Sequence, residues 1–236
     1  EYAGFVVDDF LRVNLLNKNM LSFLGDVEGK CVLDAGCGEG YFSRILSGLG
    51  AHVKGIDGST RLIERAQEKK GEHGVVFSIQ DLRRSLSFET GSFDTVVANM
   101  VLMDFDPIEG AVKEFSRVLK RDGVFVFSIP HPVFFLGKLR KTLIDKLLNG
   151  LPHYNISQYH SDFRKLRPLL GVSTATYVYH RPLEYYIKIL RRGGFLVEDL
   201  SEPVLDKSVV KNKNNFLKLC VEIPPFVIVR AIKREG

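Results

Sequence analysis

The stretch VLDAGCGEGYFSRIL, residues 32–46, places three alternating glycines between an apolar run and an amphipathic segment. Cys31 to Leu33 predict a short buried strand, and the apolar spacing of Tyr41 to Leu49 predicts a helix that stops at Gly50. A strand therefore leads into a helix through Asp34 to Gly40. Because glycine has no Cβ, such a turn lets a ligand approach bare backbone, and the helix that follows offers unpaired N–H groups to an anion.

Strand and helix patterns alternate over residues 31–130, which is typical of an α/β fold with a parallel sheet covered on both faces. The other predicted strands here are His52 to Ile56, Val75 to Ile79, Thr95 to Ala98 and Val124 to Ile129. The other predicted helices are Thr60 to Lys69 and Pro107 to Leu119. The last helix carries a start signal, with Asp106 as the expected N-cap, Pro107 at the first helical position and Glu109 at the spacing of a capping box.

The alternation stops after residue 130 and returns near residue 182. Residues 133–180 are interpreted as an insertion that forms a mainly helical cap, beginning with the amphipathic stretch Leu139 to Leu148. A helix over Pro182 to Leu190 and strands over Phe195 to Leu200 and Phe226 to Ile232 complete the pattern. Without a repeat or a low-complexity linker, we expect a single domain over residues 1–236, with an N-terminal helical segment over residues 1–28.

The composition is that of an ordinary globular protein, with 45% hydrophobic and 26% charged residues. The sequence contains no apolar run long enough to cross a bilayer and no basic-then-apolar leader, although it starts without methionine, so a trimmed N-terminus stays open. Its three cysteines lack metal-ligand spacing, and we expect no bound metal and a reducing, cytoplasmic setting. Residues 1–130 carry 15 basic and 19 acidic side chains, against 18 and 9 in residues 131–236.

The glycine turn does not match a dinucleotide fingerprint, because Tyr41 stands where the third glycine is required. The pattern D-x-G-x-G-x-G from Asp34 to Gly40 instead resembles motif I of the class I S-adenosylmethionine-dependent methyltransferases, in the branch called methyltransferase type 11. The segments that extend the resemblance, in order, are VKGIDGS, FSIQDLRR, SFDTVVANMVLMDF and EFSRVLKRDGVFVFSIPHP. The resemblance covers residues 28–132 and implies a Rossmann-like, seven-stranded, mostly parallel sheet that binds S-adenosylmethionine and releases S-adenosylhomocysteine.

The resemblance also implies roles for single residues. Asp57 would bind the ribose hydroxyls, Asp81 the adenine amino group, and the backbone N–H of Leu82 the adenine ring, while Asn99 would lie beside the methionine moiety. Gly58, Leu82 and Met100 are candidates for a flat apolar slot around adenine. The expected cofactor-binding residues are Asp34, Gly36, Cys37, Gly38, Gly40, Asp57, Gly58, Asp81, Leu82, Asn99 and Met100.

On the acceptor side, His131 stands between Pro130 and Pro132 where the fifth strand ends. It is the candidate catalytic base or substrate contact, and a histidine that only fixes the loop is an equally open interpretation. Methyl transfer from a sulfonium is an in-line displacement, which needs a base only when the acceptor must lose a proton. The insertion would add an aromatic lid, and the expected substrate-binding residues are His131, Phe134, Tyr154, Tyr159, Tyr179 and His180. Tyr2 and Phe5 are weaker lid candidates.

Three functions follow from these patterns. The first is an S-adenosylmethionine-dependent methyltransferase (EC 2.1.1.-) that methylates oxygen, nitrogen or carbon of a small molecule. The second is an RNA or tRNA methyltransferase, because residues 131–236 carry a formal charge of +9 and include GKLRK, FRKLRP and ILRR. The third is a scaffold that binds the cofactor without catalysing transfer.

Overall fold

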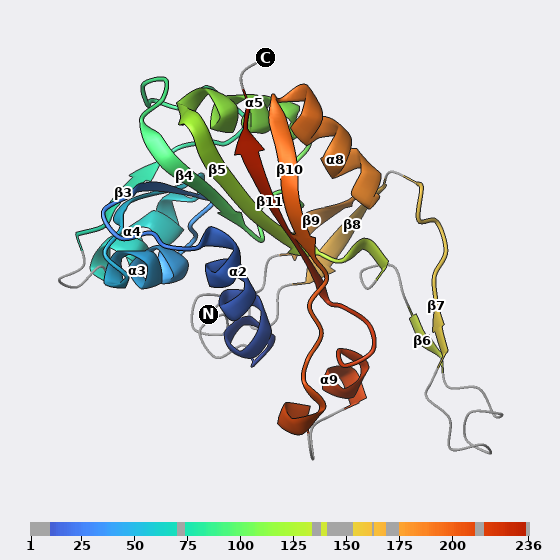
Figure 1. Cartoon of the computed structure of the whole chain (residues 1–236). Helices are drawn as coiled ribbons and strands as arrows, with labels where there is room; N and C mark the ends of the chain where they lie inside the picture. Colours follow the sequence, from blue (N-terminus) through green and yellow to red (C-terminus); the bar gives the residue numbers. More distant parts are fainter. Residues whose placement is uncertain are drawn as a thin grey trace.

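A computed structural model of the chain describes residues 10–69, 74–133, 138–140, 153–161, 163–168, 175–210 and 215–234. Its centre is a seven-stranded sheet in the order β10-β11-β5-β4-β1-β2-β3 (Figure 1). Strands β1 to β5 run parallel to one another, whereas β11 runs antiparallel to β5 and β10. The strand bounds are β1 Cys31–Ala35, β2 His52–Asp57, β3 Val76–Ile79, β4 Phe93–Asn99, β5 Leu119–Pro130, β10 Phe195–Ser201 and β11 Phe226–Lys233.

Helices cover both faces of this sheet, and each layer has its own apolar core. Helices α5 (Glu109–Val118) and α8 (Leu183–Arg192) pack on one face, around a core that includes Phe115, Phe125 and Phe127. The other face carries α2 (Asn17–Leu24), α3 (Tyr41–Gly48) and α4 (Thr60–Glu68), and η1 (Arg12–Leu16) leads directly into α2. Because both faces are covered, burial in β1, in most of β4 and in residues 123–130 of β5 is nearly continuous along the strand instead of alternating. The predicted fold class is confirmed.

The N-terminus of α5 differs from the predicted capping box. The helix begins after Ile108, which makes no side-chain cap, and it ends at Val118 because Leu119 is already extended and starts β5. The Asp106 carboxylate accepts a hydrogen bond from Arg181 at 2.6 Å, and Glu109 accepts one from the Tyr185 hydroxyl at 3.2 Å. Leaving the buried Arg181 charge unpaired would cost more than leaving a helix end uncapped, so the ion pair takes Asp106.

The described residues of the insertion lie mainly in two short strand pairs, while Val133 is helical, and the mainly helical cap expected from the sequence stays a prediction. Strands β6 (Lys138–Arg140) and β7 (His153–Asn155) pair with each other, and so do β8 (Phe163–Pro168) and β9 (Ala175–His180). In β9, Val178 and His180 are buried and Tyr177 is exposed, a period of two that aromatic and β-branched residues favour. Most of Leu139 to Leu148 lies outside the described residues.

The carboxyl ends of the parallel strands meet at the lower side of the sheet in Figure 1. Helix α2, the β8–β9 ribbon and the segment between β10 and β11 gather at this edge. That last segment contains η2 (Lys207–Val210) and α9 (Asn215–Leu219), and its Leu205, Leu217 and Cys220 pack in the core on the α2 face. In an open α/β sheet, ligands bind outside the carboxyl ends of the strands, so this edge is where a site is expected.

Candidate active site

The turn from β1 to α3 is built on three glycines in the left-handed region. Gly36, Gly38 and Gly40 have φ angles of 79°, 57° and 77°, which a residue with a Cβ rarely adopts. The backbone N–H groups of Gly36 and Cys37 both donate to the Ile56 carbonyl, at 2.8 and 2.9 Å, which fixes the turn against the end of β2. Burial raises the pKa of the Cys37 thiol, which therefore stays protonated as part of the packing.

Two of these glycines are also required by close packing. A Cβ on Gly36 would lie 2.4 Å from the Val101 side chain, and one on Gly40 would lie 2.4 Å from the Phe77 ring. A Cβ on Gly38 would meet nothing within 4 Å. The turn is therefore packed on two sides and open at its middle glycine, which leaves the backbone there accessible to a ligand.

Asp57, the last residue of β2, is joined to the turn. Its carboxylate accepts hydrogen bonds from the backbone N–H groups of Gly38, at 3.0 Å, and Ser59, at 2.8 Å. Burial raises the pKa of Asp57, and the same two hydrogen bonds oppose that rise. Gly58 follows directly, and the Gln80 N–H donates to the Asp57 carbonyl at 3.1 Å, which places the end of β3 beside this carboxylate.

Asp34 lies beneath the turn, with only 1% of its surface exposed. Its carboxylate accepts a hydrogen bond of 2.5 Å from the Ser43 hydroxyl on α3. Burial raises the pKa of Asp34 to about 6, because the hydrogen bond from Ser43 offsets only part of the desolvation and the Asp57 charge adds to it. The sequence did not single out Ser43, since a serine on a predicted helix carries no signal of its own.

At the end of β3, Asp81 and Leu82 face in different directions. The Asp81 carboxylate is half exposed and pairs with Arg83, whose Nε and Nη2 donate to its two oxygens. Those hydrogen bonds lower the pKa of Asp81. Leu82 is 7% exposed, and its side chain packs in the core on the α5 face. Its backbone follows β3 at the carboxyl edge of the sheet.

The end of β4 turns sharply beside the glycine turn. Asn99 Oδ1 accepts a hydrogen bond of 2.6 Å from the Ser128 hydroxyl on β5. Met100 has a φ of 59°, and its N–H donates to the backbone and side-chain oxygens of Ser128. Val101 then packs against Gly36. Neither Ser128 nor Val101 was expected from the sequence, because each has its partner in another element.

His131 is 5% exposed, and both of its ring nitrogens are engaged. Nε2 lies 2.5 Å from a Glu202 carboxylate oxygen, and Nδ1 accepts a hydrogen bond of 3.1 Å from the Val133 N–H. Since Nδ1 is an acceptor, the ring proton is on Nε2 and points to Glu202. The His131 N–H donates to the Pro225 carbonyl, so this residue joins the end of β5 to the segment before β11.

The structure brings some of the predicted lid residues together and leaves others undescribed. Tyr159, Phe163 and His180 form a ring cluster, in which Phe163 stacks on His180 with 5.0 Å between centroids. His180 Nε2 lies 2.9 Å from the Tyr159 carbonyl. Tyr2, Phe5 and Phe134 lie outside the described residues, and the side chain of Tyr154 does too.

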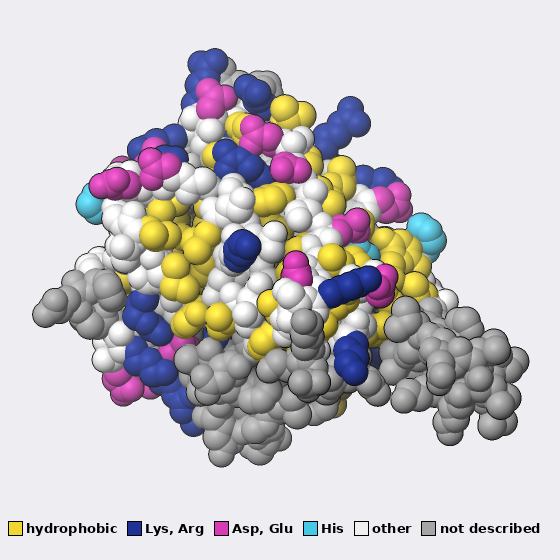
Figure 2. All heavy atoms as spheres, turned by 60° about the horizontal axis from the view of Figure 1, so that its bottom comes forward, with side chains coloured by type: hydrophobic (Ala, Val, Ile, Leu, Met, Phe, Trp, Pro, Cys, Tyr) yellow, Lys and Arg dark blue, Asp and Glu magenta, His cyan; other side chains and the backbone are white. Residues whose placement is uncertain are grey.

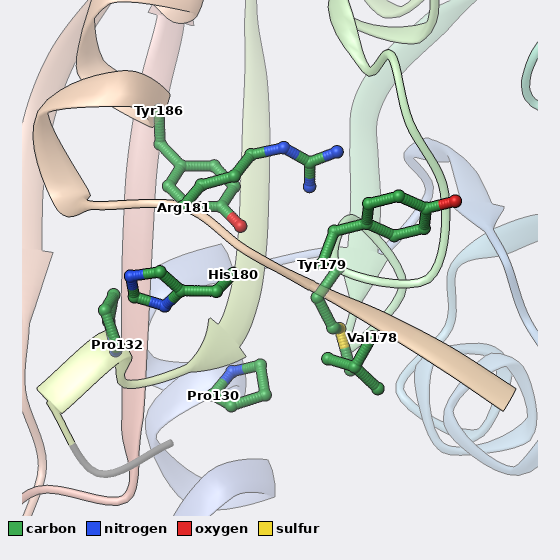
Figure 3. A pocket seen from close by; sticks show the side chains of 8 residues that line it. Pro130, Pro132, Val178, Tyr179, His180, Arg181 and Tyr186 are labelled. Carbon is green, nitrogen blue, oxygen red and sulfur yellow. The ribbon is translucent and has the colours of Figure 1, made fainter. Parts of the chain in front are cut away.

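A small cavity lies where β4 and β5 end and β9 returns. Its lining residues are Met103, Pro130, Pro132, Val178, Tyr179, His180, Arg181 and Tyr186. Its volume is ≈ 10 Å³, which is room for about one water molecule. In Figure 3, Tyr179 and Arg181 point to one side of β9, while Val178 and His180 point to the side of Pro130 and Pro132. A larger cavity of ≈ 390 Å³ lies at the amino ends of the strands, beside Cys31, His52 and Val76, away from the glycine turn.

Among the described residues, no helix combines the length and apolar character that a membrane span requires. The same residues contain no group of three or more His, Cys, Asp and Glu side chains placed to hold a metal ion.

A family model described as "Methyltransferase domain" matches residues 33–127, which run from β1 into β5. A ubiquinone biosynthesis O-methyltransferase of Paraburkholderia xenovorans is 36% identical over 124 residues, 50% of this chain and 53% of that protein. A malonyl-[acyl-carrier protein] O-methyltransferase of Legionella pneumophila is 30% identical over 136 residues, 54% of this chain and 48% of that protein. The chain thus spans about half the length of these curated relatives.

The fold comparison covers nearly the whole chain. The crystal structure of an S-adenosylmethionine-dependent methyltransferase from Mesorhizobium loti superposes with a TM-score of 0.78, over 92% of this chain and 96% of that one, at 23% identity. The strand order, the glycine turn and the family match agree. Residues 33–127 thus match the methyltransferase domain family, and the chain has the fold of the class I S-adenosylmethionine-dependent methyltransferases.

Proposed function

We propose that this chain transfers a methyl group from S-adenosylmethionine to an oxygen of a small-molecule acceptor. The observation that carries the proposal is the junction of the glycine turn with Asp57, through the Gly38 N–H, at the carboxyl edge of the sheet. Both relatives described above are named O-methyltransferases, which favours oxygen over nitrogen or carbon.

The residues at the turn fit the chemistry of this cofactor. Asp57 offers two carboxylate oxygens to ribose hydroxyls, and the open backbone at Gly38 leaves room beside it. Asn17 is buried, its Oδ1 has no hydrogen-bond partner among the described residues, and its Nδ2 donates to the hydroxyl of Tyr41, the first residue of α3. An unpaired buried acceptor suits the methionine ammonium. The bound cofactor would supply a methyl group on a positively charged sulfur.

The chain's own contribution to transfer would be alignment and exclusion of water. Met103, Pro130 and Pro132 at the strand ends and Tyr179 on β9 present an apolar, aromatic surface with little free space. We propose that Tyr179 forms part of the acceptor wall. Tyr159 and His180 are assigned to the packing that supports it, because their rings contact each other and His180 stacks on Phe163.

His131 is proposed to hold the end of β5 in position. Its Nδ1 lone pair is occupied by the Val133 N–H, so acting as a base would require that contact to break. If His131 positions the loop, His131→Gln lowers turnover by a similar factor at every pH. If it is the base, the same variant abolishes the acidic limb of the pH profile instead.

The test of the proposed function has two stages. Calorimetry with S-adenosylhomocysteine should give saturable, one-to-one binding, and NADH should give none. Methyl transfer from labelled S-adenosylmethionine is then measured with a panel of phenols, quinols, carboxylic acids and amines. Transfer to oxygen acceptors supports the proposal, whereas transfer only to amines contradicts its oxygen assignment. Binding without transfer to any panel member would favour the scaffold interpretation.

A further inference from the structure

Arg181 is a buried arginine between β9 and α8, with 3% of its surface exposed. Its Nη1 donates to the Leu102 carbonyl at 3.0 Å, and its Nη2 donates to the Phe105 carbonyl at 2.7 Å and to the Asp106 carboxylate at 2.6 Å. All three acceptors belong to the loop that connects β4 to α5. The planar guanidinium therefore binds one loop at three points, a geometry that a single ammonium group does not provide.

The same loop is attached to β9 by further contacts. The Tyr179 N–H donates to the Met103 carbonyl at 2.8 Å, and the Arg181 guanidinium lies 5.4 and 5.3 Å from the Tyr179 and Tyr185 ring centroids. Figure 3 shows the Tyr179 ring and the Arg181 guanidinium on the same side of β9. Although burial lowers the pKa of Arg181, the hydrogen bond to Asp106 and the neighbouring tyrosines more than offset it and raise that pKa. Arg181 stays charged here.

The other end of this loop touches the glycine turn. Val101 packs so closely on Gly36 that a Cβ there would overlap it, and the Met100 N–H is bonded to Ser128. Residues 100–106 therefore lie between the turn that is assigned to the cofactor and the strand that is assigned to the acceptor wall.

We propose that Arg181 is a positioning residue, which holds β9 of the insertion against the loop over residues 102–106 and so sets the acceptor wall opposite the cofactor. The proposal rests on the proposed function, because only the proposed function makes this wall a contact for the acceptor. The attachment itself is a property of the ligand-free chain. Because no other side chain combines a fixed charge with a planar set of donors, lysine should not replace Arg181.

The experiment compares hydrogen exchange in the wild type, Arg181→Met, Arg181→Lys and the control Arg164→Met. Arg164 is exposed on β8 and stacks on Tyr177 at 4.4 Å, so its loss removes a similar side chain from the same ribbon. We expect both Arg181 variants to exchange at least tenfold faster at residues 177–180 and 102–106. Strands β1 and β4 should keep their wild-type rates, and the affinity for S-adenosylhomocysteine should change less than threefold.

Four outcomes would overturn the proposal. Unchanged exchange at residues 177–180, or equally fast exchange after Arg164→Met, would show that Arg181 does not hold the strand. A uniform rise over the whole sheet would show only a global role in stability. A tenfold loss of S-adenosylhomocysteine affinity would assign Arg181 to the cofactor side.

With an acceptor from the panel, the variants should raise the acceptor KM and leave the S-adenosylmethionine KM unchanged.

A second variant keeps the proposal testable if Arg181→Met does not fold. Asp106→Asn removes the carboxylate but leaves the carbonyls of Leu102 and Phe105, so it should give a smaller rise in exchange in the same two segments. If the wild type does not bind S-adenosylhomocysteine, the proposed function fails, whereas exchange in the ligand-free protein still decides whether Arg181 holds β9.

Discussion

Asp57 is the residue on which cofactor binding should depend most. Its carboxylate already accepts two backbone N–H groups, which orient its oxygens toward the edge of the sheet. Asp57→Asn keeps the size but replaces one acceptor by a donor. Hydrogen bonds to a charged group contribute about 1.5–3 kcal/mol each, so we expect at least a tenfold loss of S-adenosylhomocysteine affinity by calorimetry. Glu68→Gln, an exposed charge loss at the end of α4, is the matched control and should bind normally.

The raised pKa of Asp34 predicts how the stability of the fold changes with pH. Since the folded protein holds its proton up to a pKa of about 6, against 3.8 ordinarily, the stability contributed by the protonated form is complete below pH 4. It is lost as the pH rises through 6. Asp34→Asn should remove this loss, about 3 kcal/mol at most, so the variant gains stability relative to the wild type between pH 4 and pH 7. Urea unfolding at pH 4, 5, 6 and 7 measures it, and parallel curves for the two proteins would contradict the prediction.

Among the elements, the β1–α3 turn offers a comparison between two glycines. Gly36→Ala combines a positive φ with a clash against Val101, whereas Gly38→Ala has the positive φ and open space. The left-handed conformation alone costs about 1–2 kcal/mol, so Gly36→Ala should lower the free energy of unfolding clearly more than Gly38→Ala. Val101→Ala in the Gly36→Ala background should restore part of the difference. Additive effects of the two substitutions would argue against direct contact.

Most of the strands and helices could be predicted from the sequence because their signals are local. A short, mostly buried run between turn residues defines β1 and β4, and the start of α3 at Tyr41 follows from the glycines before it. The capping box at Asp106 was wrong for a non-local reason: Arg181, 75 residues away, takes the carboxylate. The β8–β9 ribbon was not predicted from the sequence, because each of its strands offers only six residues in which to recognise a period.

The candidate site shows the same limit at the scale of the whole molecule. The glycines of the turn and Asp57 could be predicted from the sequence, because their chemistry depends on residue type and position along the chain. Ser128, Val101 and Arg181 matter through contacts that only the assembled sheet creates. The insertion leaves β5 beside His131 and returns beside Arg181, and both are buried and hydrogen-bonded across the carboxyl edge. The two ends of the proposed acceptor side are thus fixed by one residue that the sequence singled out, His131, and by one that it did not, Arg181.

The positive charge of residues 131–236 is the observation that favours RNA as an alternative acceptor. Several of the basic side chains in this range are paired with acids, namely Lys188 with Glu184, Lys207 with Glu222, Arg230 with Glu198, Arg234 with Asp122 and Arg181 with Asp106. On the face in Figure 2, Lys and Arg lie among Asp and Glu over the visible described surface. Paired and dispersed charges bind phosphates weakly, so the +9 does not by itself make a nucleic-acid surface.

We therefore expect the full chain to bind a hairpin RNA no more tightly than about 1 µM at 150 mM salt, the tight end of non-specific binding. Fluorescence anisotropy at 50, 100 and 200 mM salt measures this. Reversing the exposed charges Arg191 and Arg192 at the end of α8 to glutamate should leave methyl transfer to a small acceptor unchanged. Binding below 1 µM at 150 mM salt, weakened at least tenfold by that double reversal, would instead identify RNA as the acceptor and displace the small-molecule assignment.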